Sequence, residues 1–315
     1  MPASHRTPTG TKSNCRIEVA RAGYSTCQST SYSHSDHFTI LCNSVTIPRK
    51  SFLGDATLNQ QSDKFIYRRL SDAELHDFQQ QGYHQYGPIL TDSGLRQMRD
   101  ECMAAWSAVK SSFDSNKTWL ENSLLPDVHH RAQIVLDYYF TGPLVDVAEQ
   151  IIGPNIKGVT TQLTFKMRGN TKTFPWHQDN GYGELDPYNA ISCLTALDDT
   201  DQANGCLWLI SSSNLEGQRR HEQAAKDGTY SELRTEADES KAIPMPMKAG
   251  ECLFFSCWTL HKSEPNRSDR DRRILFMRYA DADAVEVYND RTPRLGRLLR
   301  GTTRYVGVKN YEADL

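Results

Sequence analysis

The stretch FPWHQD, residues 174–179, lies between two short apolar segments that have the length of β-strands, residues 158–167 and 190–197. Three further segments rich in apolar and β-forming residues follow at 206–210, 251–257 and 273–279. Turn-forming residues such as Asn204-Gly205 and Pro265-Asn266 separate these segments. Many short strands divided by turns predict a jelly-roll barrel.

The chain before this region has helical signals. Ser71 and Glu74 have the spacing of a capping box, and Gly82 is a suitable helix end. A second helix should begin near Asp92 or Ser93, because apolar residues recur downstream at helical spacing. A third helix is expected over residues 143–152, ended by Gly153-Pro154. The predicted fold class is therefore mainly β with flanking helices.

Length and composition exclude several classes of protein. The 315 residues allow one large domain or two small ones, and the formal charge of −3 gives no reason to expect nucleic-acid or membrane-surface binding. No apolar run is long enough to span a bilayer. The expected partner is a small-molecule substrate, and the sequence leaves the oligomeric state open.

The eight cysteines include no C-x-x-C pair, which argues against a zinc ribbon. Cys193, Cys206, Cys252 and Cys257 lie in apolar runs, where cysteine usually behaves as a small buried hydrophobe. We therefore expect a reducing, intracellular compartment, with the cytoplasm as the default.

Residues 1–60 differ from the remainder in being rich in Ser and Thr, and the first 35 contain one acidic residue, Glu18. This composition is typical of an organelle transit peptide. A disordered extension or a mis-assigned gene start is an equally open interpretation. Residues 61–315 are expected to form the barrel domain, with residues 216–241 as a charged insertion that is either simply solvated or a helical lid.

Two H-x-D tripeptides occur, at His34 to Asp36 and at His177 to Asp179. Residues at i and i+2 on a strand point to the same side, so such a tripeptide can supply two metal ligands. The first copy lies in the Ser-rich extension without a neighbouring strand, and we interpret it as a coincidence. For the second copy alone, a hydrogen-bonded histidine beside a turn aspartate remains an open alternative.

His261 supplies a third candidate ligand, because it follows the predicted strand at 251–257. Two imidazoles and one carboxylate are the usual protein ligands of non-haem iron(II) oxygenases. Arg272 and Arg273 begin the next apolar strand and must point to opposite faces, so only one can enter the barrel. A buried arginine there would bind the far carboxylate of 2-oxoglutarate. We interpret the nearby Arg270 as part of a solvated turn.

Taken together, these residues resemble the phytanoyl-CoA dioxygenase family of iron(II)- and 2-oxoglutarate-dependent oxygenases. The resemblance extends from about Leu70 to Tyr279. Its ordered markers are the helix start at residues 70–74, the motif at 176–179, residues 204–207, residues 261–263, Asn266 and residues 272–273. It implies a double-stranded β-helix fold, the jelly-roll barrel of cupins. It also implies that His177, Asp179 and His261 bind Fe(2+), with 2-oxoglutarate and molecular oxygen as cosubstrates.

The resemblance assigns further roles around the metal. Arg272, eleven residues after His261, matches the residue that binds the far carboxylate of 2-oxoglutarate, and Ser263 matches one that hydrogen-bonds the same group. Gln162 falls where family members often contact the cosubstrate. Lys166 has a similar position, but we interpret it as a surface lysine.

The implied reaction is hydroxylation of a small organic substrate with release of succinate and carbon dioxide. Halogenases of related fold lack the ligand carboxylate, so Asp179 favours hydroxylation or desaturation. The alternatives are a non-catalytic jelly-roll binding protein and a cupin-type metalloenzyme that does not use 2-oxoglutarate. Arg272 and Ser263 discriminate against the latter, because such an enzyme has no need of them.

Two departures from the family pattern lie near the expected barrel mouth. Residues 211–214 read Ser-Ser-Ser-Asn in place of a Pro-Gly-Ser/Thr-His run, and Lys262 replaces a common glycine. Trp176 and Trp258 flank two of the candidate ligands, and we expect them to pack the barrel. Tyr182 and Tyr188 follow Asp179 and could line the substrate entrance or lie on the surface.

Overall fold

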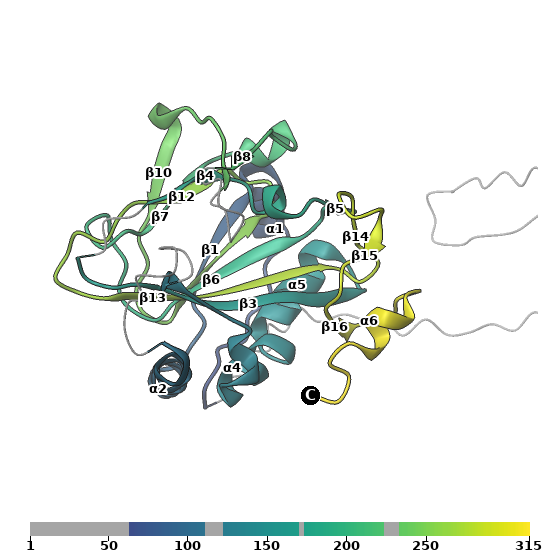
Figure 1. Ribbon diagram of the computed structural model, residues 1–315, viewed down its shortest axis with the longest axis horizontal. Coiled ribbons are helices and arrows are strands. Elements are labelled where there is room, and N and C mark those ends of the chain that lie inside the picture. The colour runs from purple at the N-terminus through teal and green to yellow at the C-terminus, as the bar shows by residue number, and fades with distance from the viewer. Residues whose placement is uncertain (1–62, 111–121, 170–172, 224–232) are drawn as a thin grey trace, which may run out of the picture. The chain divides into compact units, whose positions relative to one another are not determined.

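Two antiparallel sheets form the centre of the fold in the computed structural model, which describes residues 63–110, 122–169, 173–223 and 233–315 (Figure 1). Within these residues, the larger sheet has the strand order β1 (Tyr83–Pro88), β11 (Glu251–Ser256), β6 (Ile191–Ala196), β13 (Arg272–Asp281), β3 (Ile156–Lys166) and β16 (Arg297–Arg300), and β2 (Leu124–Pro126) also pairs with β3. The smaller sheet has the order β10 (Ala242–Met245), β7 (Leu207–Ile210), β12 (His261–Ser263) and β4 (Phe174–His177). The predicted jelly-roll architecture is confirmed.

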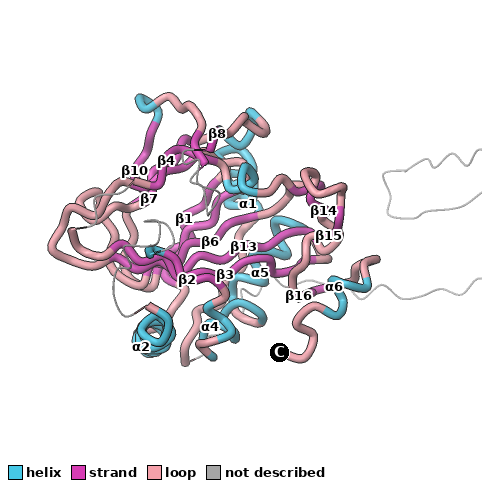
Figure 2. Tube along the Cα trace, in the orientation of Figure 1, coloured by secondary structure: helices cyan, strands magenta, loops and turns pink. Residues whose placement is uncertain are grey.

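Two small sheets lie at the periphery. One joins β15 (Thr292–Pro293), β14 (Val285–Glu286) and β5 (Leu185–Asp186), and the other joins β8 (Glu222–Gln223) and β9 (Leu233–Arg234). The helices are α1 (Asp72–Gln81), α2 (Asp92–Val109), α4 (Gln133–Phe140), α5 (Pro143–Ile152) and α6 (Val306–Asn310). Figure 2 shows α2, α4 and α5 on the side of the larger sheet that faces away from the smaller sheet.

The alternation of side chains along β13 separates the helix-covered core from the barrel interior. Leu275, Met277 and Tyr279 join the hydrophobic core that the helices cover. Ile274 and Phe276 point to the other face, where they line the cavity between the two sheets. Because successive strand residues point to opposite faces, this one strand contributes to both regions.

The three predicted helices are confirmed, and their ends have the expected chemistry. Both reciprocal hydrogen bonds of the capping box join Ser71 and Glu74, and Gly82 ends α1 with a left-handed backbone at φ 80°. Helix α2 begins at Asp92, with the side chain of Thr91 as its cap. The sequence did not predict α4, because its residues QIVLDYYF are mostly apolar and β-forming and its polar face is only Gln133 and Asp137.

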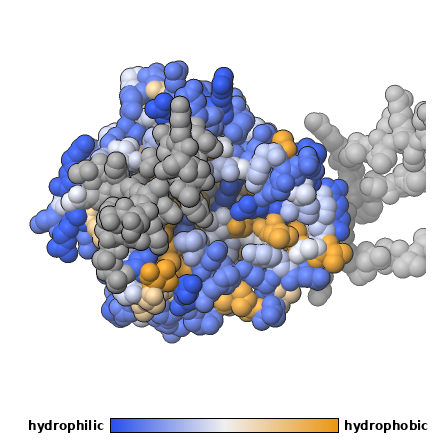
Figure 3. Space-filling view, in the orientation of Figure 1, coloured by the Kyte–Doolittle hydropathy of each residue, from blue (hydrophilic) through white to orange (hydrophobic). Residues whose placement is uncertain are grey.

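The predicted burial of cysteine is also confirmed. The cysteines within the described residues are all free and buried: Cys102, Cys193, Cys206, Cys252 and Cys257. The interpretations of residues 1–60, including the tripeptide at His34, concern residues outside the described ranges. In the part of the chain that the structure describes, no helix has the length and apolar character needed to cross a membrane. Figure 3 shows that the described surface on the face in view is mostly hydrophilic, with isolated hydrophobic patches.

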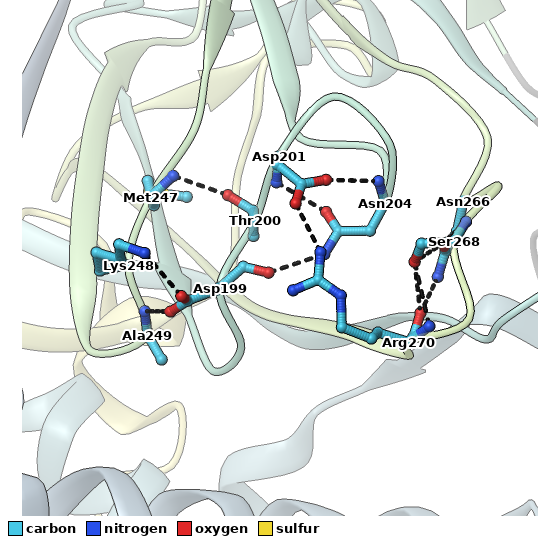
Figure 4. Close-up of polar contacts among 10 residues, drawn as sticks. All are labelled: Asp199, Thr200, Asp201, Asn204, Met247, Lys248, Ala249, Asn266, Ser268 and Arg270. Atoms are coloured by element: carbon cyan, nitrogen blue, oxygen red, sulfur yellow. Dashed lines mark hydrogen bonds and ion pairs between the residues drawn. The ribbon is translucent and has the colours of Figure 1, made fainter.

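Two asparagines that serve as family markers build turns beside the barrel (Figure 4). The backbone N–H of Asp201 donates to Asn204 Oδ1 at 2.8 Å, and Asn204 Nδ2 donates to the carbonyl of Asp199 at 2.8 Å. Asn266 Nδ2 donates to the carbonyls of Lys166 at 3.0 Å and Arg270 at 2.6 Å. As predicted for a solvated turn, Arg270 is exposed, and it pairs with Asp201 at 2.6 Å.

Gly205, which follows the first of these asparagines, is required by both conformation and space. Its backbone is left-handed at φ 82°, and a Cβ atom there would lie 2.4 Å from the carbonyl oxygen of Glu264. Gly87 has a similar φ of 80°, but a Cβ atom there would meet no atom within 4 Å. A substitution at Gly87 therefore tests backbone strain alone, whereas one at Gly205 tests backbone strain together with steric overlap.

We predict that Gly205→Ala destabilises the fold more than Gly87→Ala does. The left-handed backbone alone should cost Gly87→Ala about 1–2 kcal/mol in the free energy of unfolding. The overlap with Glu264 should add about 1–3 kcal/mol for Gly205→Ala. Chemical denaturation of both variants measures the difference, and equal losses would show that the Glu264 backbone yields freely.

Candidate active site

The structure brings together the three residues that the sequence predicted as metal ligands. His177 ends β4, Asp179 begins the 3-10 helix η2 (Asp179–Tyr182), and His261 begins β12. Strands β4 and β12 pair with His261 opposite His177. The Oδ1 atom of Asp179 lies 3.6 Å from His177 Nε2 and 3.5 Å from His261 Nε2, and all three residues are buried.

Hydrogen bonds from the far side of each ring orient the two imidazoles. His177 Nδ1 lies 2.7 Å from the carbonyl oxygen of Pro175, and His261 Nδ1 lies 2.9 Å from that of Thr259. A carbonyl only accepts, so each Nδ1 carries the proton and each Nε2 presents a lone pair toward Asp179. Two imidazole nitrogens and a carboxylate oxygen that converge in this way fit a divalent metal such as iron(II).

The electrostatics of the cluster favour the protonation states that a metal needs. Burial and the neighbouring His261 ring lower the pKa of His177, which favours the neutral imidazole. Burial alone would raise the pKa of Asp179, but His261 and His177 outweigh it and hold the pKa well below its usual range. Neutral imidazoles and an ionised carboxylate are the forms that ligate metals.

Ser192 is a functional residue that the sequence interpretation missed. It is buried on β6, and its hydroxyl donates to Oδ2 of Asp179, which leaves Oδ1 facing the two histidines. The signal was present, because Ser192 and Thr195 are the two polar residues of the predicted strand at 190–197. Ser192 lies on the same strand face as Leu194, which lines the cavity, whereas Thr195 lies on the opposite face. We infer that Ser192 sets the rotation of the carboxylate.

The described residues contain one other group that could bring three such atoms together, formed by His129, His130 and Glu312. His130 is exposed, and Glu312 is only partly buried. None of the three lines the cavity between the sheets. The cluster of His177, Asp179 and His261 is therefore the candidate that combines burial with access to a cavity.

A cavity of about 290 Å³ opens beside this cluster, between the two sheets. Most of its wall is apolar, and the larger apolar side chains include Phe174, Leu194, Leu207, Phe255, Ile274 and Phe276. Polar side chains also face the cavity, and they include the three residues of the metal cluster.

Of the two adjacent arginines that begin β13, Arg272 is the one that enters the barrel. It lines the cavity and is 3% exposed, and no hydrogen-bond partner of its Nε atom lies within the described residues. Arg273 points to the opposite face and forms a bidentate pair with Asp198, at 2.8 and 2.6 Å. Burial lowers the pKa of Arg272 to about 10, still well above neutral pH.

Lys166 lies beside Arg272 inside the barrel, and our interpretation of it as a surface residue was wrong. It is fully buried, and its Nζ atom donates to Ser263 Oγ at 2.7 Å and to the Ser263 carbonyl at 3.1 Å. Residues 160, 162, 164 and 166 of β3 share one strand face, and the first three line the cavity. Burial and Arg272 lower the pKa of Lys166 well below its ordinary value.

Ser263 and Gln162 also line the cavity, in agreement with the positions that the sequence predicted for them. Because Ser263 Oγ accepts from Lys166, the hydroxyl proton of Ser263 is available to a group inside the cavity. Gln162 lies on β3 opposite Phe276 of β13 in the sheet register. Arg272, Ser263 and Gln162 therefore share one cavity with the metal cluster.

The aromatic residues around the motif divide between packing and the cavity. Trp176 packs with Ile210 and Leu260, as expected for a barrel packing residue. Tyr182 lines the cavity, and its ring lies edge-on to that of His177, with 5.3 Å between ring centroids. Tyr188 does not line the cavity, and it stacks on Trp258 at 3.4 Å.

The described ends of the charged insertion are tied to the metal motif rather than simply solvated. Gln178 is fully buried, and its side chain bonds the carbonyl of Gly217 and the backbone N–H of Arg219, both at 2.8 Å. Lys262, the departure from the family pattern, pairs with Glu239 and Glu264, each at 2.8 Å. Both ends of the insertion thus contact residues adjacent to a candidate ligand.

Comparison with known proteins gives the family of the chain. Residues 78–274, more than half of the chain, match the family described as phytanoyl-CoA dioxygenase. The chain is 26% identical over 231 residues to a methylphosphonate hydroxylase of Gimesia maris. The aligned region covers 70% of this chain and 85% of that protein. It is also 27% identical over 152 residues to the peroxisomal phytanoyl-CoA dioxygenase of Rattus norvegicus, and this alignment covers 46% of this chain and 45% of that relative.

A solved structure has the same fold. It is a non-haem, alpha-ketoglutarate-dependent carbocyclase, SnoK, from nogalamycin biosynthesis, with a TM-score of 0.58 and 19% identity over 74% of this chain and 94% of that chain. The chain therefore belongs to the phytanoyl-CoA dioxygenase family. It is an enzyme of the iron(II)- and 2-oxoglutarate-dependent oxygenase class.

Proposed function

We propose that this protein hydroxylates a small organic substrate and converts 2-oxoglutarate to succinate and carbon dioxide. The observation that carries the proposal is that a buried His–Asp–His cluster and a buried arginine with an unpaired Nε atom line the same cavity. The cluster accounts for the metal, and the arginine accounts for a dicarboxylate cosubstrate. The chain spans about half of the rat relative, so the activity of the whole protein remains our proposal.

In this proposal, His177 and His261 hold iron(II) through Nε2, and Asp179 holds it through Oδ1. When bound, iron(II) would activate molecular oxygen, which is the oxidant. 2-Oxoglutarate would supply two electrons and take one oxygen atom as it becomes succinate and carbon dioxide, and the substrate C–H bond would supply the other two electrons and take the second oxygen atom. The Nδ1 hydrogen bonds and Ser192 hold the three ligand atoms in place before the metal arrives. Such support reduces the reorganisation that binding requires.

Arg272 binds the far carboxylate of 2-oxoglutarate, with Ser263 as a second donor. The guanidinium is buried at one end of β13, so a carboxylate there replaces hydrogen bonds that Arg272 lacks within the described protein. A planar guanidinium matches a carboxylate better than an ammonium group does. Lys166 orients Ser263, and Gln162 contacts the body of the cosubstrate from β3.

The cavity wall and Asp179 direct the outcome of the reaction. Apolar side chains such as Phe255, Ile274 and Phe276 surround the space beside the ligands and exclude water from it. Asp179 occupies the ligand position that halogenases of related fold leave open. The carboxylate of Asp179 supports hydroxylation rather than halogenation.

We further propose that residues 61–315 form the oxygenase domain and that residues 1–60 are a separate extension. The helices, sheets and cavity of the described residues all lie within the first of these ranges. The free, buried cysteines support a reducing, intracellular location.

Iron-loaded protein supplied anaerobically with 2-oxoglutarate and then exposed to air should form succinate, and His177→Ala should abolish this product. The expected loss is at least about 100-fold, because two ligands hold the metal poorly. Measurement of succinate together with iron content tests both parts. Failure of the wild type to bind iron and 2-oxoglutarate together would support a non-catalytic barrel or a cupin that does not use 2-oxoglutarate.

Ser192→Ala should weaken iron(II) affinity by about 10- to 100-fold, the usual effect of removing a group that orients a ligand. Thr195→Ala is the matched control, since Thr195 is a buried hydroxyl on the same strand that contacts Tyr138 instead. Metal titration should show a loss only for Ser192→Ala. Equal losses in both variants would mean that β6 acts through general stability.

Arg272→Ala should weaken 2-oxoglutarate binding by at least about 30-fold, because loss of one partner of a buried charge pair costs about 2–5 kcal/mol. Arg273→Ala removes a neighbouring charge that faces Asp198 outside the cavity, and it should change that affinity less than about twofold. Calorimetric titration of the anaerobic, iron-loaded protein measures both. Similar effects of the two substitutions would show that the assignment of Arg272 is wrong.

A further inference from the structure

The inner face of β13 carries a second arginine that the proposed cosubstrate site does not use. Arg272, Ile274, Phe276 and Arg278 all line the cavity from this strand. Six residues of strand span about 20 Å, so the two guanidinium-bearing residues lie at opposite ends of the cavity wall. Arg272 lies beside Lys166 and Ser263, whereas Arg278 pairs in register with Ser192, the residue that bonds Asp179.

Arg278 is held by neutral groups. Its Nε atom donates to Cys257 Sγ at 3.1 Å, and one terminal nitrogen donates to Asn180 Oδ1 at 3.2 Å. Burial raises the pKa of the Cys257 thiol, so that partner carries no charge near neutral pH. Among the described residues, no carboxylate lies within the 4.0 Å of an ion pair with Arg278.

Apart from Arg272, which the cosubstrate would occupy, the other arginine and the lysine that line the cavity have carboxylate partners. Arg294 pairs with Glu286 at 2.8 Å, and Lys262 pairs with Glu239 and Glu264, each at 2.8 Å. Arg278 therefore differs from both: it faces the cavity, and its hydrogen bonds fix its direction without neutralising it. A guanidinium fixed in this way is preorganised for an oxyanion.

The sum of the charges in the site, with iron(II) and 2-oxoglutarate bound, also favours an anionic substrate. The two charges of iron(II) and the two carboxylates of 2-oxoglutarate cancel. Of the cavity groups not paired with a carboxylate, Arg272 and Arg278 are positive and Asp179 is negative. Lys262 has two carboxylate partners, but the Glu239 side chain is 61% exposed, so solvent screens its charge. With Lys166 counted as neutral, one positive charge then remains in a largely apolar cavity, where an uncompensated charge is unfavourable.

We propose that the substrate carries a small oxyanion, a carboxylate or a phosphonate, which binds Arg278 on the side of the metal cluster opposite Arg272. This inference rests on the proposed function, because it takes iron and 2-oxoglutarate as already bound. The anion lies next to Asn180 and Tyr182, and the remainder of the substrate extends along the apolar wall. The cavity of about 290 Å³ also holds 2-oxoglutarate, so the substrate is small.

The name of one relative is consistent with this class. Methylphosphonate, the substrate in the name of the Gimesia maris hydroxylase, is a small oxyanion of this kind. The competing explanation is that Arg278 only supports the metal loop through Asn180 and the strand end through Cys257. Binding measurements separate the two, because a supporting residue would affect iron and 2-oxoglutarate as much as any anion.

The test is calorimetric titration of anaerobic protein already loaded with iron(II) and 2-oxoglutarate. The probes are butyrate with its neutral counterpart butyramide, and methylphosphonate with its neutral dimethyl ester. We expect at least one anion to bind at least tenfold more tightly than its neutral counterpart. The preferred anion then distinguishes a carboxylate from a phosphonate substrate.

Arg278→Gln should lower the affinity of that anion at least tenfold and leave the 2-oxoglutarate affinity within about twofold. Arg278→Lys, which keeps the charge but not the fork of donors, should show an intermediate loss. Arg273→Gln removes an arginine of the same strand that faces away from the cavity, and it should change neither affinity. Thermal unfolding verifies that each variant is folded.

The outcomes separate this inference from the function on which it rests. If the wild type does not bind 2-oxoglutarate, the proposed function itself fails. If 2-oxoglutarate binds but neither anion exceeds its neutral counterpart, the inference is overturned. It is also overturned if Arg278→Gln keeps the preference for the anion, or if Arg278→Gln and Arg278→Lys both lose iron and 2-oxoglutarate.

Discussion

The antiparallel pairing of β4 with β12 is the constraint on which the site depends. It sets His261 opposite His177, although the two residues are 84 positions apart in the chain. The carboxylate of Asp179 then falls within 3.6 Å of both Nε2 atoms. The outer nitrogens of both imidazoles already bond carbonyls, so the two Nε2 atoms and the carboxylate form a converging set of ligand atoms. The fold therefore creates a place that a divalent metal completes.

Strand β13 of the larger sheet contributes residues to the cavity on one face and to the hydrophobic core on the other. Arg273, Leu275, Met277 and Tyr279 of β13 point away from the cavity, and the three apolar members anchor the helix-covered core. The inner face places an arginine at each end of the cavity wall, with two apolar residues between them. Two anions can thus be bound at separate places, while the space between them stays apolar. This separation is what a reaction between a dicarboxylate cosubstrate and a second anionic molecule requires.

The departures from the family pattern occur at the barrel mouth and leave the ligands unchanged. Lys262 replaces a common glycine, and its ammonium group joins Glu239 of the insertion to the strand that carries His261. Gln178, between the two ligands of the motif, bonds the other end of the same insertion. Residues adjacent to the candidate ligands therefore hold the described ends of the insertion.

The sequence by itself determined the strand segments, the helices with capping signals and the three candidate ligands, because these depend on local patterns. The sequence did not predict helix α4, because six of its eight residues are apolar or aromatic and favour strands; its burial against α2, α5 and β3 explains why it is helical. Alternation along β13 required that either Arg272 or Arg273 enter the barrel. The structure shows that it is Arg272, because Arg273 pairs with Asp198 on the opposite face. Lys166, Ser192 and Arg278 acquire their roles from strand pairing, which places each beside residues far away in the sequence. The tertiary structure decided these roles, because contact between distant strands is set by sheet register, and the local sequence does not encode it.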